Sequence, residues 1–101
     1  MCIAHIGPII INPYASVGEN CRVHVGVNIG ADARISDAAP IIGNNIYIGP
    51  GAKLFGKIEI ADGIAIGANA VVNKSFLEQD ISIAGVPAKK VGAVGTKGIL
   101  Y

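Results

Sequence analysis

Two histidines are the side chains of this sequence best suited to moving a proton near neutral pH. His5 lies close to the N-terminus, and its imidazole could act as a general base on a hydroxyl group. His24 follows Val23, an aliphatic residue expected to point inward, so the imidazole of His24 should point outward. The alternatives are that His5 only ends a frayed first element and that His24 is an ordinary surface or interface residue.

The other reactive side chains form no pattern typical of a metal site, so we expect no metal. A zinc enzyme of the carbonic anhydrase type needs three histidines around the metal, and the chain has two. Cys2 and Cys21 lack the spacing of zinc ligands; we expect both to be free thiols, with Cys21 packed inward. Three carboxylates on expected surfaces or loops show no pairing that requires chemistry: Asp32, Asp37 and Glu59.

The composition excludes several classes of protein. Of the 101 residues, 51% are hydrophobic and only 15% are charged, which excludes a disordered chain. The formal net charge of +1 gives no electrostatic argument for a nucleic-acid partner. No apolar run approaches the roughly 20 residues of a membrane-spanning helix, and the start of the chain lacks a basic leader. We therefore expect a cytoplasmic protein.

A repeat of six residues supplies the elements that must position these side chains. Aliphatic residues recur six apart in two runs separated by a slip of one residue: Ile11, Val17, Val23, Ile29, Ile35, then Ile42, Ile48, Leu54, Ile60, Ile66 and Val72. A period of six fits neither a helix nor one long strand, but it fits a coil with three flat sides of six residues each. The repeat predicts an all-β fold, a parallel β-helix of about four coils with the aliphatic side chains inside and glycine or asparagine in the turns.

Two places interrupt this repeat. Residues 35–41 carry the extra residue, and Pro40 cannot donate a ladder hydrogen bond, so we expect a small external bulge or loop there. After Val72 the repeat stops, and Ile81 to Ala84 is predicted to be a last strand. Residues 1–92 are therefore expected to form the β-helix domain and residues 93–101 a C-terminal tail, with a loose chain from residue 91 onward.

Several segments resemble the left-handed β-helix, hexapeptide-repeat acyltransferases. The sequence from Ala84 to Lys89, AGVPAK, is similar to the end of that repeat domain. The sequence from His5 to Asn12 resembles the catalytic-histidine segment of serine acetyltransferases and of their polysaccharide-modifying relatives. Residues 48–53 and 66–72 are similar to the coil sequences of the same subgroup.

The resemblance implies a left-handed coil, a homotrimer, and acetyl-CoA as the co-substrate in a groove between subunits. His5 would take the proton from the hydroxyl of a small-molecule or glycan acceptor. Small residues would line the pantetheine arm, and lysines would lie near the coenzyme phosphates: Gly67, Ala68, Lys74, Lys89 and Lys90. The alternatives are that the turn itself requires Gly67 and Ala68 to be small, and that the lysines belong to a solvated surface.

The chain also departs from the serine acetyltransferase pattern. Ala4 stands where those enzymes have an aspartate, and Ala39 stands where they have a second histidine before Pro40. A sugar hydroxyl is therefore at least as good an acceptor as serine. The upstream coil that would orient His5 and cap the first coil is also missing, which leaves two functions open: an O-acetyltransferase, or a non-catalytic trimeric assembly module or truncated remnant.

Overall fold

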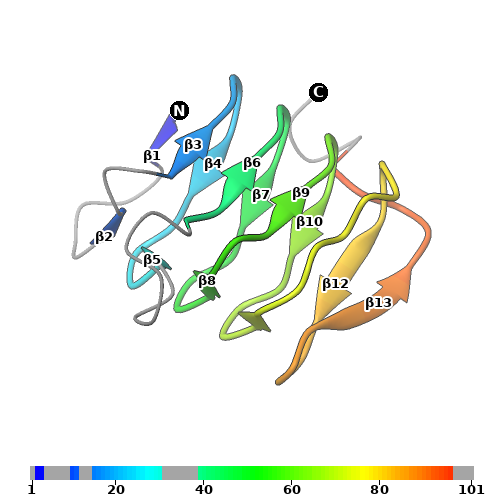
Figure 1. Cartoon of the computed structure of the whole chain (residues 1–101). Helices are drawn as coiled ribbons and strands as arrows, with labels where there is room; N and C mark the ends of the chain where they lie inside the picture. Colours follow the sequence, from blue (N-terminus) through cyan, green and yellow to red (C-terminus); the bar gives the residue numbers. More distant parts are fainter. Residues whose placement is uncertain (1, 4–9, 12–14, 31–38, 97–101) are drawn as a thin grey trace.

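The structure is a computed structural model that describes residues 2–3, 10–11, 15–30 and 39–96. The described residues form short strands that wind around one axis (Figure 1). The strands are β1 (Cys2–Ile3), β2 (Ile10–Ile11), β3 (Ser16–Val17), β4 (Arg22–Val23), β5 (Asn28–Gly30), β6 (Ile41–Ile42), β7 (Tyr47–Ile48), β8 (Lys53–Phe55), β9 (Glu59–Ile60), β10 (Ala65–Ile66), β11 (Val71–Val72), β12 (Ser82–Ala84) and β13 (Lys89–Gly92).

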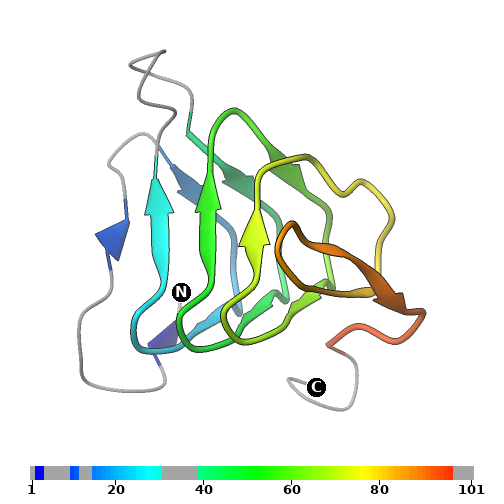
Figure 2. The same ribbon diagram turned by 90° about the horizontal axis from the view of Figure 1, so that it is seen from below.

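From β1 to β11 every third strand joins the same sheet, as a three-sided coil requires, and β12 and β13 then extend the first of these sheets. Sheet A has the order β1-β4-β7-β10-β12-β13, sheet B the order β11-β8-β5-β2, and sheet C the order β3-β6-β9. Phe76 continues sheet C through a parallel bridge to Ile60. All strand pairs are parallel except β12 with β13. The three sheets are the sides of a prism, and Figure 2 shows its coils following one another from left to right, so the predicted parallel β-helix is confirmed.

The core consists of the predicted inward positions. The aliphatic residues of the repeat are almost fully buried from the second coil onward: Val23, Ile29, Ile42, Ile48, Leu54, Ile60, Ile66 and Val72. Cys21 fills a small inward position at 0% exposure, as expected. Alternation within each two- or three-residue strand explains this pattern, because successive side chains of a strand point to opposite faces.

The interruption between sheets B and C is larger than the sequence suggested. Val17 pairs with Ile42, 25 residues later, whereas Ile42 pairs with Ile60 after 18 residues. The coil therefore carries seven extra residues between Gly30 and Ile41, and the predicted slip of one residue is wrong. Among the described strands, β5 in sheet B is followed by β6 in sheet C, whose inward residue is Ile42. Residues 31–38, with Asp32 and Asp37, lie outside the described residues.

The C-terminal residues were also predicted incorrectly, because residues 91–96 are not a loose tail. β13 pairs with β12, and Ser82 Oγ donates to the carbonyl of Val94. Thr96, at 0% exposure, donates from its N–H to the Gly63 carbonyl at 3.0 Å and from its hydroxyl to the Asn45 carbonyl at 2.6 Å. We call residues 93–96 the C-terminal strap. Within the described residues no helix is long and apolar enough to cross a membrane.

Candidate functional site

Gly67 and Ala68, together with His24, lie on the corner that joins sheet A to sheet B. We call this edge of the prism the A–B corner; it consists of residues 24–27, 49–52 and 67–70 in successive coils. Residues 85–88 continue it by backbone bonds to Val71, although they connect β12 to β13 within sheet A. Backbone bonds hold the coils in register, from the Gly49 N–H to the Ile66 carbonyl at 2.8 Å and from the Gly67 N–H to the Ile83 carbonyl at 2.9 Å. His5 falls between β1 and β2 in the chain but lies outside the described residues.

His24 lies on the A–B corner and is partly exposed. The backbone N–H of His24 donates to the Ile48 carbonyl at 3.2 Å, in register with the later coils. The imidazole lies against the Tyr47 ring of the next coil, with ring centroids 5.0 Å apart and an angle of 59° between the planes. A tilted aromatic contact of this kind stabilises the ring orientation. The contact therefore explains the position of His24 without a catalytic role.

Close stacking of the coils explains the small residues of this corner. A Cβ added to Gly49 would lie 2.7 Å from the backbone nitrogen of Ala68, which no side chain tolerates. A Cβ on Gly67 would lie 3.1 Å from the Cβ of Ala84, which is tight but not prohibitive. Ala68 itself is exposed. The corner thus presents main chain and a methyl group to the outside, a surface that a narrow ligand could approach.

The three candidate lysines lie in different surroundings. Lys89 is exposed and follows the last stretch of the A–B corner directly, where the Ala88 N–H donates to the Val71 carbonyl at 2.8 Å. Lys90 forms a salt bridge of 2.8 Å with Glu78. Lys74 follows β11 on the way to sheet C, with its Nζ 5.4 Å from the centre of the Phe76 ring. The described structure therefore brings Lys89, but not Lys74, to the corner that carries Gly67.

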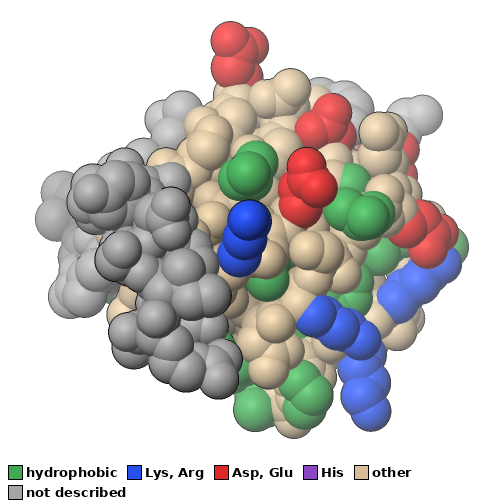
Figure 3. Space-filling model, in the orientation of Figure 1, with side chains coloured by type: hydrophobic (Ala, Val, Ile, Leu, Met, Phe, Trp, Pro, Cys, Tyr) green, Lys and Arg blue, Asp and Glu red, His purple; other side chains and the backbone are tan. Residues whose placement is uncertain are grey.

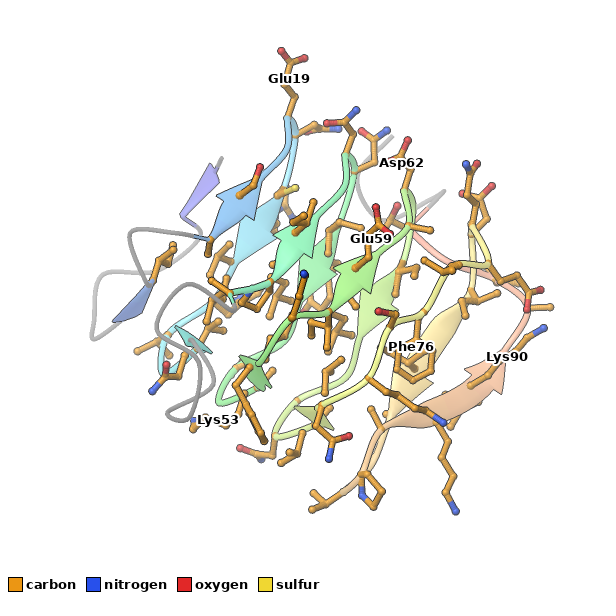
Figure 4. The ribbon with its side chains drawn as sticks, viewed as in Figure 1. Glu19, Lys53, Glu59, Asp62, Phe76 and Lys90 are labelled. Carbon is orange, nitrogen blue, oxygen red and sulfur yellow. The ribbon has the colours of Figure 1, made fainter. Side chains whose placement is uncertain are left out.

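Sequence reasoning missed Lys53, which extends from β8 toward the same corner (Figure 4). Its Nζ donates to the carbonyl oxygen of Gly26 at 3.0 Å and to that of Gly51 at 2.9 Å. These two glycines hold equivalent positions in successive coils, with φ of 79° and 75°. The sequence signal for such a contact is weak, because it depends on two main-chain carbonyls that only the coiled backbone brings together.

A hollow lies elsewhere, on the outer side of sheet C. It has a volume of about 260 Å³ and is lined by Ile41, Lys57, Ile58, Glu59 and Ser75. Figure 3 looks onto this side of the molecule, where positive and negative side chains lie beside hydrophobic ones. Glu59, weighed as a candidate carboxylate, is exposed here, and its backbone N–H donates to Ser75 Oγ at 2.9 Å. No predicted site residue from the A–B corner reaches this hollow.

Neither a metal nor a thiol nucleophile is supported by the described residues. They contain no group of three or more histidine, cysteine, aspartate or glutamate side chains that could hold a metal ion. Burial raises the pKa of the Cys21 thiol, and its Sγ lies 3.2 Å from the Gly43 carbonyl oxygen, to which it can donate. A thiol whose pKa is raised is less ionised and therefore less nucleophilic. Cys21 is thus a packing residue.

Comparison with known proteins gives consistent results. No family model matches the sequence. The chain is 31% identical to a serine acetyltransferase of Synechococcus elongatus over 96 residues, which cover 94% of the chain and 39% of that protein. It is 34% identical to a serine acetyltransferase of Mycobacterium tuberculosis over 91 residues, 89% of the chain and 39% of that protein.

Solved structures show the same relationship. Serine acetyltransferase from Neisseria gonorrhoeae matches with a TM-score of 0.85 and 30% identity, over 96% of this chain and 38% of that one. Serine acetyltransferase from Brucella abortus in complex with coenzyme A matches with a TM-score of 0.80 and 34% identity, over 85% of this chain and 34% of that one. The chain spans less than half the length of these relatives. Within that span, its sequence and its fold both support a place in the hexapeptide-repeat acetyltransferase family.

Proposed function

We propose that this chain provides the β-helix of an acetyl-CoA-dependent O-acetyltransferase, with the coenzyme lying along the A–B corner. The observation that carries the proposal is the placement of Gly67 and Ala68 on the A–B corner, with Lys89 directly after the stretch 85–88 that is hydrogen-bonded to Val71. β1 is in register with β4, because Ile3 pairs with Val23, and His5 follows Ile3 by two residues in the sequence. The acceptor hydroxyl would then bind at the end of the groove near His5, and the coenzyme phosphates would bind at the other end, near Lys89.

The length of the corner suits this ligand. From the first coil to Lys89 there are four intercoil spacings of about 4.8 Å, or about 19 Å in all. An extended acyl-pantetheine arm is of similar length. Lys89 would contribute a positive charge near the coenzyme phosphates, because its ammonium group is a point charge on a flexible side chain. Lys74 lies on a different edge of the described structure, so its assignment to the coenzyme is the weakest of the set.

The proposed reaction is a direct acetyl transfer. His5 accepts the proton of the acceptor hydroxyl as the oxygen attacks the thioester carbonyl of acetyl-CoA. Backbone N–H groups stabilise the negative charge that develops on the carbonyl oxygen. The C–S bond then breaks, the acetyl ester forms, and the thiolate of coenzyme A takes up the proton held by His5.

Serine is the acceptor favoured by the relatives, whose names all identify serine acetyltransferases. A sugar hydroxyl remains the second candidate because Ala4 and Ala39 replace two polar residues of the serine pattern. The homotrimer and the cytoplasmic location predicted from the sequence remain part of the proposal, with no nucleic-acid partner and no metal.

A thermal shift experiment tests the coenzyme site first. Acetyl-CoA and free coenzyme A, at concentrations well above a micromolar dissociation constant, should raise the melting temperature of the purified chain by mass action. Zinc should not. Acetyl transfer to serine and to sugar acceptors would then be followed by the release of the coenzyme thiol.

Two variants separate catalysis from binding. His5→Ala should retain the coenzyme-induced shift and lose acetyl transfer. Glu19→Gln, an exposed change on the corner between sheets C and A, serves as the matched control and should change neither. A cooperative melt with no response to either coenzyme would contradict the proposal and would favour the non-catalytic assembly module.

A further inference from the structure

We propose that Lys53 is a coenzyme-binding residue that donates a hydrogen bond to a carbonyl oxygen of the pantetheine arm. This inference rests on the proposed function and adds a residue to its site. Lys53 belongs to sheet B, yet its ammonium group lies at the A–B corner, against two carbonyl oxygens. The corner stretches themselves contain no lysine, arginine, aspartate or glutamate: 24–27, 49–52, 67–70 and 85–88.

The two contacts place the Lys53 ammonium group between coils. The Gly26 and Gly51 carbonyls belong to successive turns of the corner, and the Gly51 N–H itself donates to the Val25 carbonyl at 3.0 Å. The lysine therefore holds two turns at a fixed separation. A side chain anchored at both carbonyls loses little further freedom when a ligand binds, and preorganisation of this kind favours affinity.

The ammonium group keeps a donor for a ligand. Lysine has three N–H donors, and contacts among the described residues use two of them. The third N–H is available to an acceptor atom that approaches the corner from outside. Lys53 is exposed, so a ligand can reach it.

The position along the corner identifies the part of the coenzyme. Lys53 contacts the second and third coils, between β1 of the first coil, which His5 follows in the sequence, and Lys89 at the far end. The phosphates would lie near Lys89 and the thioester near His5. The middle of the arm carries amide groups, whose carbonyl oxygens accept hydrogen bonds. Lys53 should therefore recognise an amide of the arm and not the nucleotide.

Two ligands test this assignment by isothermal titration calorimetry. Coenzyme A contains the pantetheine arm, whereas adenosine 3′,5′-bisphosphate has the nucleotide phosphates without it. Lys53→Met should weaken coenzyme A binding about tenfold, the loss expected for one partly exposed hydrogen bond from a charged donor. The affinity for adenosine 3′,5′-bisphosphate should stay unchanged. Lys53→Arg, which keeps the charge and the donors, should recover most of the coenzyme affinity.

Lys57→Met is the matched control, because Lys57 is an exposed lysine of the same β-helix that lines the hollow on sheet C. It should leave both affinities unchanged. Equal coenzyme A affinity in the wild type and in Lys53→Met would overturn the assignment while leaving the proposed function intact. Equal weakening of both ligands would also overturn it, since that result indicates a general distortion of the corner. Absence of binding to the wild-type protein would overturn the proposed function and the assignment together.

Discussion

The two ends of the prism have the same repeat chemistry but differ in burial. In the first coil the inward residues Ile11, Ala15 and Val17 are only partly buried, whereas Val72 and Ile83 at the other end are 0% and 1% exposed. The C-terminal end is covered by residues 85–88 and by β13, and the strap secures it (Figure 1). An inward position in the sequence is thus not sufficient for burial; a neighbouring coil or cap must lie on each side, as in other solenoids.

A matched pair of valines tests this contrast most strongly. Val72→Ala should lower the free energy of unfolding by about 2 kcal/mol, because it leaves a cavity in a closed core. Val17→Ala should cost about 1 kcal/mol or less, since part of that side chain already contacts solvent. Urea unfolding of both variants measures the difference. Equal losses would mean that the first coil is as well packed as the last.

The strap can be broken at one hydrogen bond. Thr96→Val keeps the shape of the side chain but removes the hydroxyl that donates to the Asn45 carbonyl. We expect a loss of about 1–2 kcal/mol in the free energy of unfolding, because this carbonyl would lose its partner in a partly buried place. Val94→Ala, at a side chain that is 69% exposed, is the control for a strap residue without such a contact. A strap that contributes nothing would give the same result for both variants.

Cys21 offers a pH-dependent probe on the second coil, next to the partly buried residues of the first. Burial raises the pKa of its thiol in the folded protein. Below roughly pH 8.5, the pKa of a cysteine in an unfolded chain, this contribution to stability is complete. As the pH rises further, the unfolded chain loses its proton first and stability declines until the folded thiol also ionises. The measurement is the urea midpoint as a function of pH, in a Cys2→Ser background that leaves Cys21 as the only thiol. Cys21→Ala should remove the decline of the midpoint at alkaline pH. The same decline in both proteins would exclude the Cys21 thiol as its cause.

The smallest expected effect concerns the ion pair at the capped end. Lys90 and Glu78 are 45% and 61% exposed in their side chains, so solvent screens their 2.8 Å contact. Lys90→Met should change the free energy of unfolding by less than about 0.5 kcal/mol. A loss as large as that of Thr96→Val would show that the salt bridge, and not the strap, holds the cap in place.

The sequence predicted the parts of the fold that depend on a local pattern. Inward positions such as Ile48 and Ile66 follow from the six-residue period, because each short strand buries alternate side chains. The size of the insertion after Gly30 could not be predicted in this way. The six-residue spacing of the sequence continues to Ile35, whereas the pairing of Val17 with Ile42 gives the inward position of the next described side to Ile42.

The candidate site was predictable where it follows the repeat and unpredictable where it depends on contacts across coils. Gly67 and Ala68 could be placed on a turn from their position after Ile66. The contact of Lys53 with two carbonyls, and the separation of Lys74 from Lys89, required the stacked backbone. His5 lies outside the described residues, so its role as a general base stays a prediction.

The strap also imposes an order on the assembly of the fold. The Thr96 hydroxyl reaches a carbonyl 51 residues earlier in the chain, at Asn45, and its N–H reaches the corner of the next coil at Gly63. Both acceptors are in place only after the coils that contain them have stacked. During synthesis the strap leaves the ribosome after the coils that contain Asn45 and Gly63, so it can dock only once these coils have stacked. In a chain whose coils are misaligned, the strap would stay undocked and accessible to proteases.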